Sequence, residues 1–267
     1  DPTDPTAILT QIQMQNTFTF ETYNASGYAN TAVVQPVLPF PVAMPGLKEF
    51  APFHIVRPTL PFPAPTADPD GPLGVQGGMG DFTILDVAIH PTSWGNIAFG
   101  YSLIAPTSTD PQLGLQEWQF GPSLGLIYKK VPKTNLGLVA QVPFSLESDA
   151  QEVDVQVVAV RHLPNEWYLR WGDTFSTFNT ATGAYNIPIQ PAIGKVVKKG
   201  LFGLPNNIFL AGEYTPGDLH SGTGGSLWGI KLNVTLLMPE AKLNPLLGFL
   251  WGDDKHACHC GSSCSCR

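Results

Sequence analysis

The segment from Trp228 to Met238 alternates strictly between apolar and polar side chains. Its even positions read Trp, Ile, Leu, Val, Leu and Met, and its odd positions from Gly229 to Thr235 read Gly, Lys, Asn and Thr. Because successive side chains of a β-strand point to opposite faces, this segment has one apolar face and one polar, partly charged face. Many such strands, with no helix to cover the apolar face, predict a barrel whose apolar side meets lipid and whose polar side lines a lumen.

The same alternation recurs along the chain. Between residues 8 and 20, apolar even positions alternate with odd positions that include Gln11, Gln13 and Gln15. We expect about twelve strands, at roughly 8–20, 32–40, 53–62, 81–90, 96–105, 117–129, 135–146, 153–162, 165–176, 185–198, 206–215 and 226–238. Six aromatic residues near strand ends would form interfacial girdles: Trp118, Tyr128, Trp167, Tyr185, Tyr214 and Trp228. The general preference of aromatic residues for strands explains any single one of them equally well.

The composition agrees with a β-rich membrane protein. Charged residues make up 13% of the 267 residues, against roughly 25% in typical soluble domains. No run of about 18 apolar residues exists, so the sequence contains no transmembrane helix. The net charge is −7 and no basic stripe is present, which argues against nucleic acid as a partner. The chain begins with Asp1, as expected for a mature form whose signal peptide has been removed.

The connections alternate in length. Short turns fall at 91–95, 129–135 and 163–166, whereas longer or more polar loops include 62–80 and 106–117. An even number of strands with both termini on the short-turn side is the arrangement of bacterial outer membrane barrels. We therefore predict an all-β fold: a transmembrane, antiparallel, up-and-down β-barrel over residues 1–238, followed by an extension over 239–267 with a Cys/His-rich end.

Proline residues complicate several of these strands, because proline cannot donate a hydrogen bond to the ladder. They are Pro36, Pro58, Pro122, Pro143, Pro188 and Pro191. We expect them to mark bulges or bends.

Several strand segments also resemble a known family. They are QPVLPF (35–40), RPTLPF (57–62), GMGDFTILD (78–86), WQFGPSLGLIY (118–128), LVAQVPFSL (138–146), LPNEWYLRW (163–171), PIQPAIGKVVKKG (188–200) and WGIKLNVTLLMP (228–239). Together they resemble the outer membrane proteins named for the meta-pathway of phenol degradation, which are described as transporters. The resemblance implies a β-barrel and transport of small hydrophobic or aromatic compounds. Residues 239–267 depart from the usual ending of such barrels, which finish on an aromatic residue.

The alternation predicts which polar residues line the lumen. Ionisable residues expected to point inward are Arg57, Asp86, Asp154, Glu213 and Lys231, with the neutral residues Gln11, Gln13, Gln15, Gln119 and Asn233 beside them. Charges in a narrow conduit set the selectivity of a pore. Alternatively, these charges neutralise one another in a packed network that conducts nothing. A barrel of about twelve strands lies between the filled eight-stranded case and the open porins.

The C-terminal end is the second candidate site. Four cysteines and two histidines lie close together: His256, Cys258, His259, Cys260, Cys264 and Cys266. Thiolates and imidazoles prefer ions such as zinc or copper, so this tail is a candidate metal site. Two disulfides in an oxidising compartment, or an exposed disordered tail, explain the same residues. The tail could also dock on a periplasmic or outer membrane protein partner.

No motif for catalysis is present: the sequence lacks the nucleophile elbow, the zinc-protease helix motif and the P-loop. We therefore expect no enzyme and no catalytic residue. The leading hypothesis is an outer membrane channel or transporter for small, hydrophobic or aromatic solutes. The alternatives are a closed structural barrel whose tail binds metal or a partner complex, and a secreted soluble β-sandwich.

Overall fold

A computed structural model describes residues 3, 6, 9–23, 27–40, 49–65, 77–222 and 225–238. Its described part is built from β-strands and three short 3-10 turns, η1 (Pro164–Glu166), η2 (Leu201–Gly203) and η3 (Gly217–Leu219). No helix in these ranges is long and apolar enough to cross a membrane.

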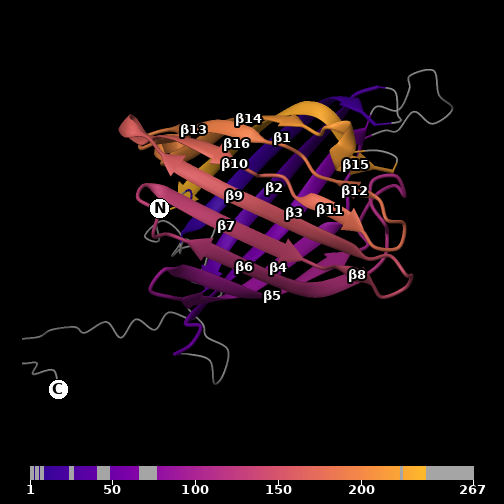
Figure 1. The fold of residues 1–267 in the computed structure, drawn as a ribbon, viewed down its shortest axis with the longest axis horizontal. Coiled ribbons are helices and arrows are strands. Elements are labelled where there is room, and N and C mark those ends of the chain that lie inside the picture. The colour runs from indigo at the N-terminus through magenta and orange to yellow at the C-terminus, as the bar shows by residue number, and fades with distance from the viewer. Residues whose placement is uncertain are drawn as a thin grey trace, which may run out of the picture.

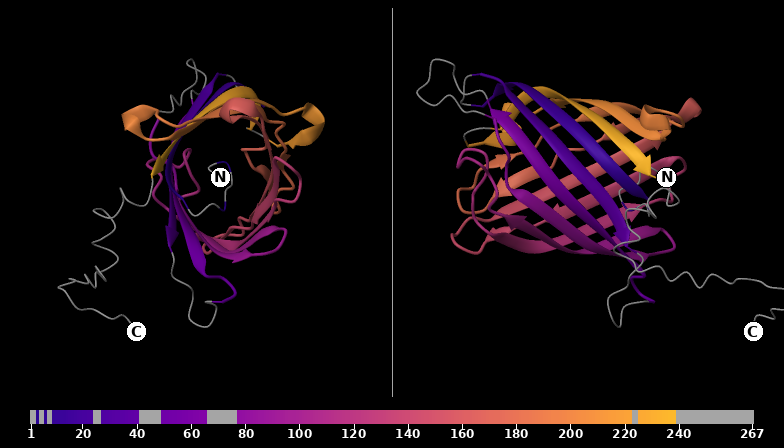
Figure 2. Two further views of the ribbon diagram at one scale, coloured as in Figure 1. Left: turned by 90° about the vertical axis from the view of Figure 1, so that its left-hand side faces the viewer. Right: turned by 180° about the vertical axis from the view of Figure 1, so that it is seen from behind.

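The strands form one closed, antiparallel, twelve-stranded barrel, which confirms the predicted fold (Figure 1). Its strands are β1 (Thr10–Thr22), β2 (Ala29–Phe40), β3 (Phe53–Pro65), β4 (Phe82–Pro91), β5 (Gly95–Ala105), β6 (Gln119–Tyr128), β7 (Thr134–Gln141) continued by β8 (Phe144–Ser145), β9 (Glu152–His162), β10 (Trp167–Trp171) continued by β11 (Ser176–Asn179), β12 (Tyr185–Asn186) continued by β13 (Pro191–Val197), β14 (Asn206–Tyr214) and β16 (Ser226–Met238). The short β15 (His220–Ser221) pairs with β12 from the loop after β14. The first and last strands pair from Thr10 with Met238 to Thr22 with Ser226, and this pairing closes the ring (Figure 2, left).

Two of the predicted proline irregularities are visible in the ladder. Pro143 lies in the break between β7 and β8. The pairing of β2 with β3 runs to Val34 and resumes at Leu38, and the gap holds Pro36 and faces Pro58 on β3. Neither proline has a backbone N–H to donate to the ladder. Because the two prolines lie in the same gap, they interrupt the pairing of β2 with β3 only once.

The two faces of the barrel wall differ as the alternation predicts. On β16, Ile230 and Leu232 are 44% and 47% exposed on the outer face, whereas Lys231 and Asn233 are 7% and 2% exposed inside. Exposed apolar side chains continue around the barrel on other strands, including Val157, Leu169, Ile193 and Leu210. An apolar surface that encircles a molecule is far larger than the patches that soluble monomers expose, and it is typical of the lipid-facing side of a membrane barrel.

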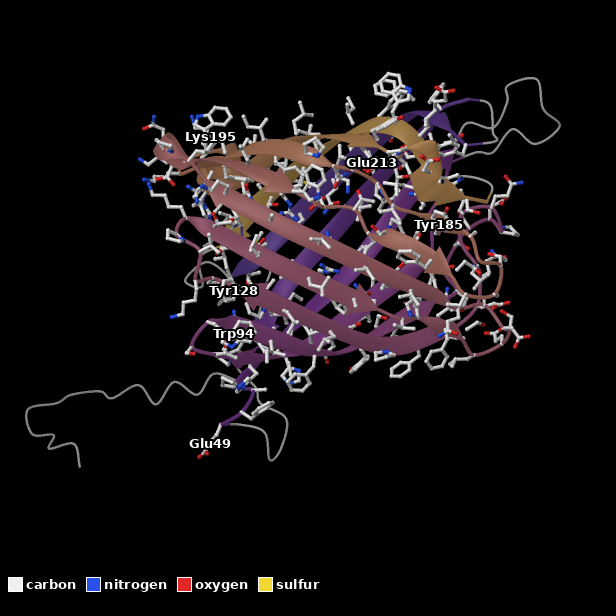
Figure 3. The ribbon with its side chains drawn as sticks, viewed as in Figure 1. Glu49, Trp94, Tyr128, Tyr185, Lys195 and Glu213 are labelled. Atoms are coloured by element: carbon white, nitrogen blue, oxygen red, sulfur yellow. The ribbon has the colours of Figure 1, made fainter. Side chains whose placement is uncertain are left out.

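Aromatic side chains lie toward the two ends of this outer surface. Trp94 and Tyr128 are near the end with the short turns, and Tyr185 is near the opposite end (Figure 3). Five of the six predicted girdle residues are exposed, and Tyr185 is half-buried.

The lumen is narrowed by two clusters of inward-facing apolar residues. One joins β2 to β5 through Val37, Ile55, Leu85, Val87, Ile89 and Ala98. The other joins β9 to β14 through Val158, Val160, Tyr168, Ala192, Phe209 and Ala211. In addition, Thr3 and Thr6 of the N-terminal segment are buried within the barrel, where Thr6 lies 2.6 Å from the side chain of Asn96 on β5. The barrel interior is therefore partly filled.

Candidate solute pathway in the barrel lumen

A cavity of about 370 Å³ lies inside the barrel between the two apolar clusters. Members of both clusters line it, and Thr3 contributes from the N-terminal segment. Six residues predicted from the alternation also line it: Gln11, Gln13, Gln15, Arg57, Lys231 and Asn233. The cavity thus has an apolar part and a polar, charged part, which is the usual composition of a site for a small organic molecule.

An inward-folded segment, Gly172–Phe175, shapes one wall of this cavity. It separates β10 from β11, and its residues Asp173, Thr174 and Phe175 all line the cavity. Gly172 makes the inward turn possible, because its φ is +73° and a Cβ built on it would lie 1.7 Å from the carbonyl oxygen of Val157. A residue with a side chain fits neither the backbone angle nor the space.

Backbone and side-chain hydrogen bonds hold the segment in place. The buried amide of Gln190 accepts hydrogen bonds from the backbone N–H groups of Asp173 and Thr174, each at 2.7 Å. The same side chain donates to Thr174 Oγ1 at 2.7 Å and to Glu213 at 2.9 Å. Gln156 donates to the carbonyl of Asp173 at 2.7 Å. These bonds satisfy polar groups that would otherwise be unpaired in the barrel interior.

The carboxylate of Asp173 is the centre of an ion-pair network. It lies 2.5 Å from Arg170 Nη2 and 3.2 Å from Lys231 Nζ. All three side chains are at most 15% exposed. Lys231 also donates to Thr174 Oγ1 at 3.0 Å, and Arg170 lies over the ring of Phe209 at 5.1 Å. Arg170 and Lys231 are therefore both engaged by contacts within the protein.

The glutamines of β1 form a ladder along the lumen wall. Gln15 donates to Gln13 at 3.4 Å, and Gln13 donates to Gln11 at 3.3 Å. On the neighbouring strand, Gln35 donates to the hydroxyl of Thr59 at 2.7 Å. These amides give the wall a row of neutral donors and acceptors beside the charged network.

Arg57 differs from the other two cations. It lines the cavity from β3, yet among the described residues it takes part in no hydrogen bond and no ion pair, and its Nε is buried without a partner. Two of its neighbours on the inner face of the wall are apolar, its lateral partner Leu85 and Ile55 two residues before it, whereas Thr59 two residues after it is polar. Within the described part of the chain, a guanidinium group without a directly paired counter-charge therefore faces the cavity.

Asp86 lies on the outer face of the barrel, which corrects the prediction that it points into the lumen. Its chain neighbours Leu85 and Val87 line the cavity, so Asp86 between them points the other way. Its carboxylate lies 3.0 Å from His54 Nδ1 and accepts a hydrogen bond from the hydroxyl of Tyr101 at 3.2 Å. The error has a simple cause. Apolar residues occupy both faces of β4, so its sequence does not show which positions face the lumen.

Three further predicted lumen residues belong to the inner face but do not line the cavity. Gln119 and Asp154 lie near the long-loop ends of β6 and β9. Glu213 is 7% exposed and accepts hydrogen bonds in the network around Gln190.

The reasoning from sequence missed Arg170, Asp173, Thr174 and Gln190. The available signal was Gly172, because a glycine inside a strand pattern marks a bulge or a close backbone approach. The predicted metal ligands, from His256 to Cys266, lie outside the described residues. Within the ranges that are described, no cluster of three or more His, Cys, Asp or Glu side chains could hold a metal ion.

Comparison with known proteins shows which solved structures have a similar fold. No protein-family model matches the chain, and no curated protein sequence matches it. The chain is similar to the solved COG4313 outer membrane channel from Pseudomonas putida F1, with a TM-score of 0.64 and 14% identity over 89% of this chain and 99% of that one. It is also similar to the KdgM porin, with a TM-score of 0.48 and 9% identity over 86% of this chain and 99% of that one. The first likeness shows that the chain shares the barrel fold of an outer membrane channel. Neither of these two structures is named for the phenol-degradation family, so that resemblance stays a prediction.

Proposed function

We propose that this protein is a bacterial outer membrane channel through which small, hydrophobic or aromatic solutes diffuse passively. The observation that carries the proposal is the pairing of an apolar outer surface with a partly polar, charged cavity inside one closed barrel. Lipid would cover the outer surface, and solutes would pass along the lumen wall formed by the β1 glutamines, Lys231 and Asn233. Longer loops, chiefly 62–80 and 106–117, would lie on the extracellular side.

Conductance of the purified full-length chain in planar lipid bilayers tests the proposal. We expect discrete conductance steps from protein whose folded state is verified by heat-modifiable gel mobility. A flat trace from folded protein contradicts it.

Two adjacent residues of β4 provide a matched pair of variants. Leu85 lines the cavity, whereas Ile84 lies on the outer face by alternation. Leu85→Trp should narrow the lumen and lower the step size, and Ile84→Trp should leave it unchanged. Equal effects of the two variants would show that the measured current does not pass through this cavity.

A closed structural barrel is the second candidate. The ion-paired segment Gly172–Phe175 and the buried Thr3 and Thr6 favour it, because they occupy space in the lumen. In this proposal, the Cys/His tail binds zinc or copper or docks on a partner complex. Elemental analysis beside a titration of free thiols tests the tail: one equivalent of metal with reduced thiols supports the metal site, and oxidised thiols without metal remove it.

A further inference from the structure

The charge of the cavity lining is unbalanced. Its ionisable residues are three cations, Arg57, Arg170 and Lys231, and a single carboxylate, Asp173. Asp173 pairs directly with Arg170 and Lys231 and reaches Arg57 only as a longer-range electrostatic attraction, so the described lining supplies no directly paired anion for the third cation. In a narrow conduit bounded by low-dielectric walls, a cation without a directly paired counter-charge attracts anions and repels cations.

Arg57 is also placed so that a bound anion would meet it without displacing a partner among the described residues. It stands on β3, and the paired cation Arg170 stands on β10, six strands away in the ring of twelve, so the two project from opposite walls. A guanidinium group presents donors in a planar fork that matches a carboxylate through two parallel hydrogen bonds.

The surface on one side of Arg57 is apolar, whereas Thr59 lies on the other side. Ile55, Leu85 and Val87 line the cavity next to it and pack in the buried cluster that joins β2 to β5. A fully hydrated inorganic anion gains nothing from this surface, whereas an organic anion can place its hydrocarbon part there. A neutral solute of the same shape would cover this apolar wall but leave the guanidinium without a directly paired counter-charge.

We propose that the cavity is a binding site for small amphipathic monocarboxylates, with the carboxylate paired to Arg57 and the apolar part against Ile55, Leu85 and Val87. A cavity of about 370 Å³ is large enough for one substituted aromatic ring or a short acyl chain. The site deepens the proposed channel function and rests on it: the same lumen that conducts would select organic anions.

Ion selectivity and block in planar bilayers test this inference on the full-length chain. The reversal potential in a potassium chloride gradient gives the chloride-to-potassium permeability ratio. Sodium benzoate is then added as the probe, with benzylamine hydrochloride as a cationic ring of the same size and benzyl alcohol as a neutral one. We expect a preference for chloride, and block of the chloride current by benzoate at concentrations at which the other two have no effect.

Variants assign the effect to one residue. Arg57→Gln should lower the permeability ratio about fivefold, the effect of one unit charge at contact distance in a wet lumen, and should abolish block by benzoate. Arg57→Lys should keep the ratio and weaken the block, because an ammonium retains the charge but not the fork. Lys198→Gln is the matched control: it removes a cation whose side chain is 80% exposed on the surface, and it should change neither measurement.

Each outcome separates the inference from the channel function. A channel that conducts without anion preference, or without block by benzoate, overturns the carboxylate site and leaves the channel standing. Selectivity that survives in Arg57→Gln overturns the role of Arg57. No conductance from folded protein overturns the channel, and the carboxylate site falls with it.

Discussion

Gly172 is the residue on which the shape of the lumen depends most directly. It turns the chain inward with a φ of +73°, and no space exists for a Cβ beside Val157. Gly183 has the same φ of +73°, but a Cβ added there would have nothing within 4 Å, so Gly183 isolates the backbone effect. Gly183→Ala should cost about 1 kcal/mol of unfolding free energy from strain alone. Gly172→Ala should cost about 2–5 kcal/mol, because overpacking adds to the strain.

Urea unfolding in phospholipid vesicles, followed by heat-modifiable mobility, measures both glycine variants. Equal losses of stability would contradict the steric role given to Gly172.

Asp173 neutralises two buried cations, so its charge should matter more than that of an exposed carboxylate. Asp173→Asn leaves Arg170 and Lys231 without a counter-charge and should lower stability by about 3 kcal/mol. Glu166→Gln breaks a surface pair with Lys198 and should cost about 0–1 kcal/mol. The same unfolding assay compares the two variants. Similar losses of stability would mean that the charge of Asp173 in the lumen is screened by water to the same extent as the charge of Glu166 at the surface.

At the scale of single residues, strand parity predicted the cavity-lining positions on β1, β3 and β16. It failed at Asp86, where apolar residues occupy both faces of β4. It also assigned no role to Asp173, because simple alternation from Arg170 would turn Asp173 outward. The bulge at Gly172 reverses that parity, and its exact conformation depends on contacts with Val157 and Gln190 that are distant in sequence.

Among the structural elements, the loop between β5 and β6 is tied to the loop after β8 by a titratable contact. Glu117 accepts hydrogen bonds from the hydroxyls of Ser145 and Ser148, each at 2.5 Å, and these bonds lower the pKa of its carboxyl below the usual 4.5. Since the folded pKa is depressed, the tether is intact above pH 4.5 and is lost as the pH falls through the folded value.

Hydrogen exchange of residues 106–118, normalised to the intrinsic rate at each pH, measures this tether. Protection should fall on acidification in the wild type. In Glu117→Gln it should be low at every pH, because the charge-assisted contact is missing. The same pH dependence in both proteins would show that another group controls the loop.

The outer face of the strands should tolerate charge according to depth in the membrane. Leu232 lies in the middle of β16, and Tyr214 is the last residue of β14. Leu232→Arg should reduce the stability of the barrel in vesicles by about 2–4 kcal/mol, and Tyr214→Arg should reduce it by about 0–1 kcal/mol. Folding titrations in lipid vesicles compare the two. A larger loss for Tyr214→Arg would place the membrane boundary elsewhere.

The elements themselves were largely predictable, because period-two alternation and turn residues mark nearly every strand. Breaks within strands were harder. The alternation predicts one strand over 165–176 and another over 185–198, yet the first is interrupted at 172–175 by the inward segment and the second at 187–190, which includes its partner Gln190. These interruptions are set by tertiary hydrogen bonds and not by local preference.

For the whole molecule, alternation in twelve strands without covering helices was enough to predict closure into a barrel. The alternation did not predict which residues partly fill the lumen. Thr3 and Thr6 of the N-terminal segment are buried in the barrel, and the two apolar clusters and the ion-pair network each depend on contacts between different strands. Only the three-dimensional arrangement shows that the described residues leave a cavity with the Arg57 guanidinium facing it.

The central claim is that one face of every strand meets lipid and the other meets an enclosed aqueous interior. Single cysteines at positions 232 and 233, in a chain whose Cys258, Cys260, Cys264 and Cys266 are replaced by serine, test it most directly in lipid vesicles. A small charged maleimide should label Asn233→Cys through the lumen, and lipid-soluble reagent alone should label Leu232→Cys. Labelling of Leu232→Cys by the charged maleimide at the rate of an exposed thiol would contradict the account.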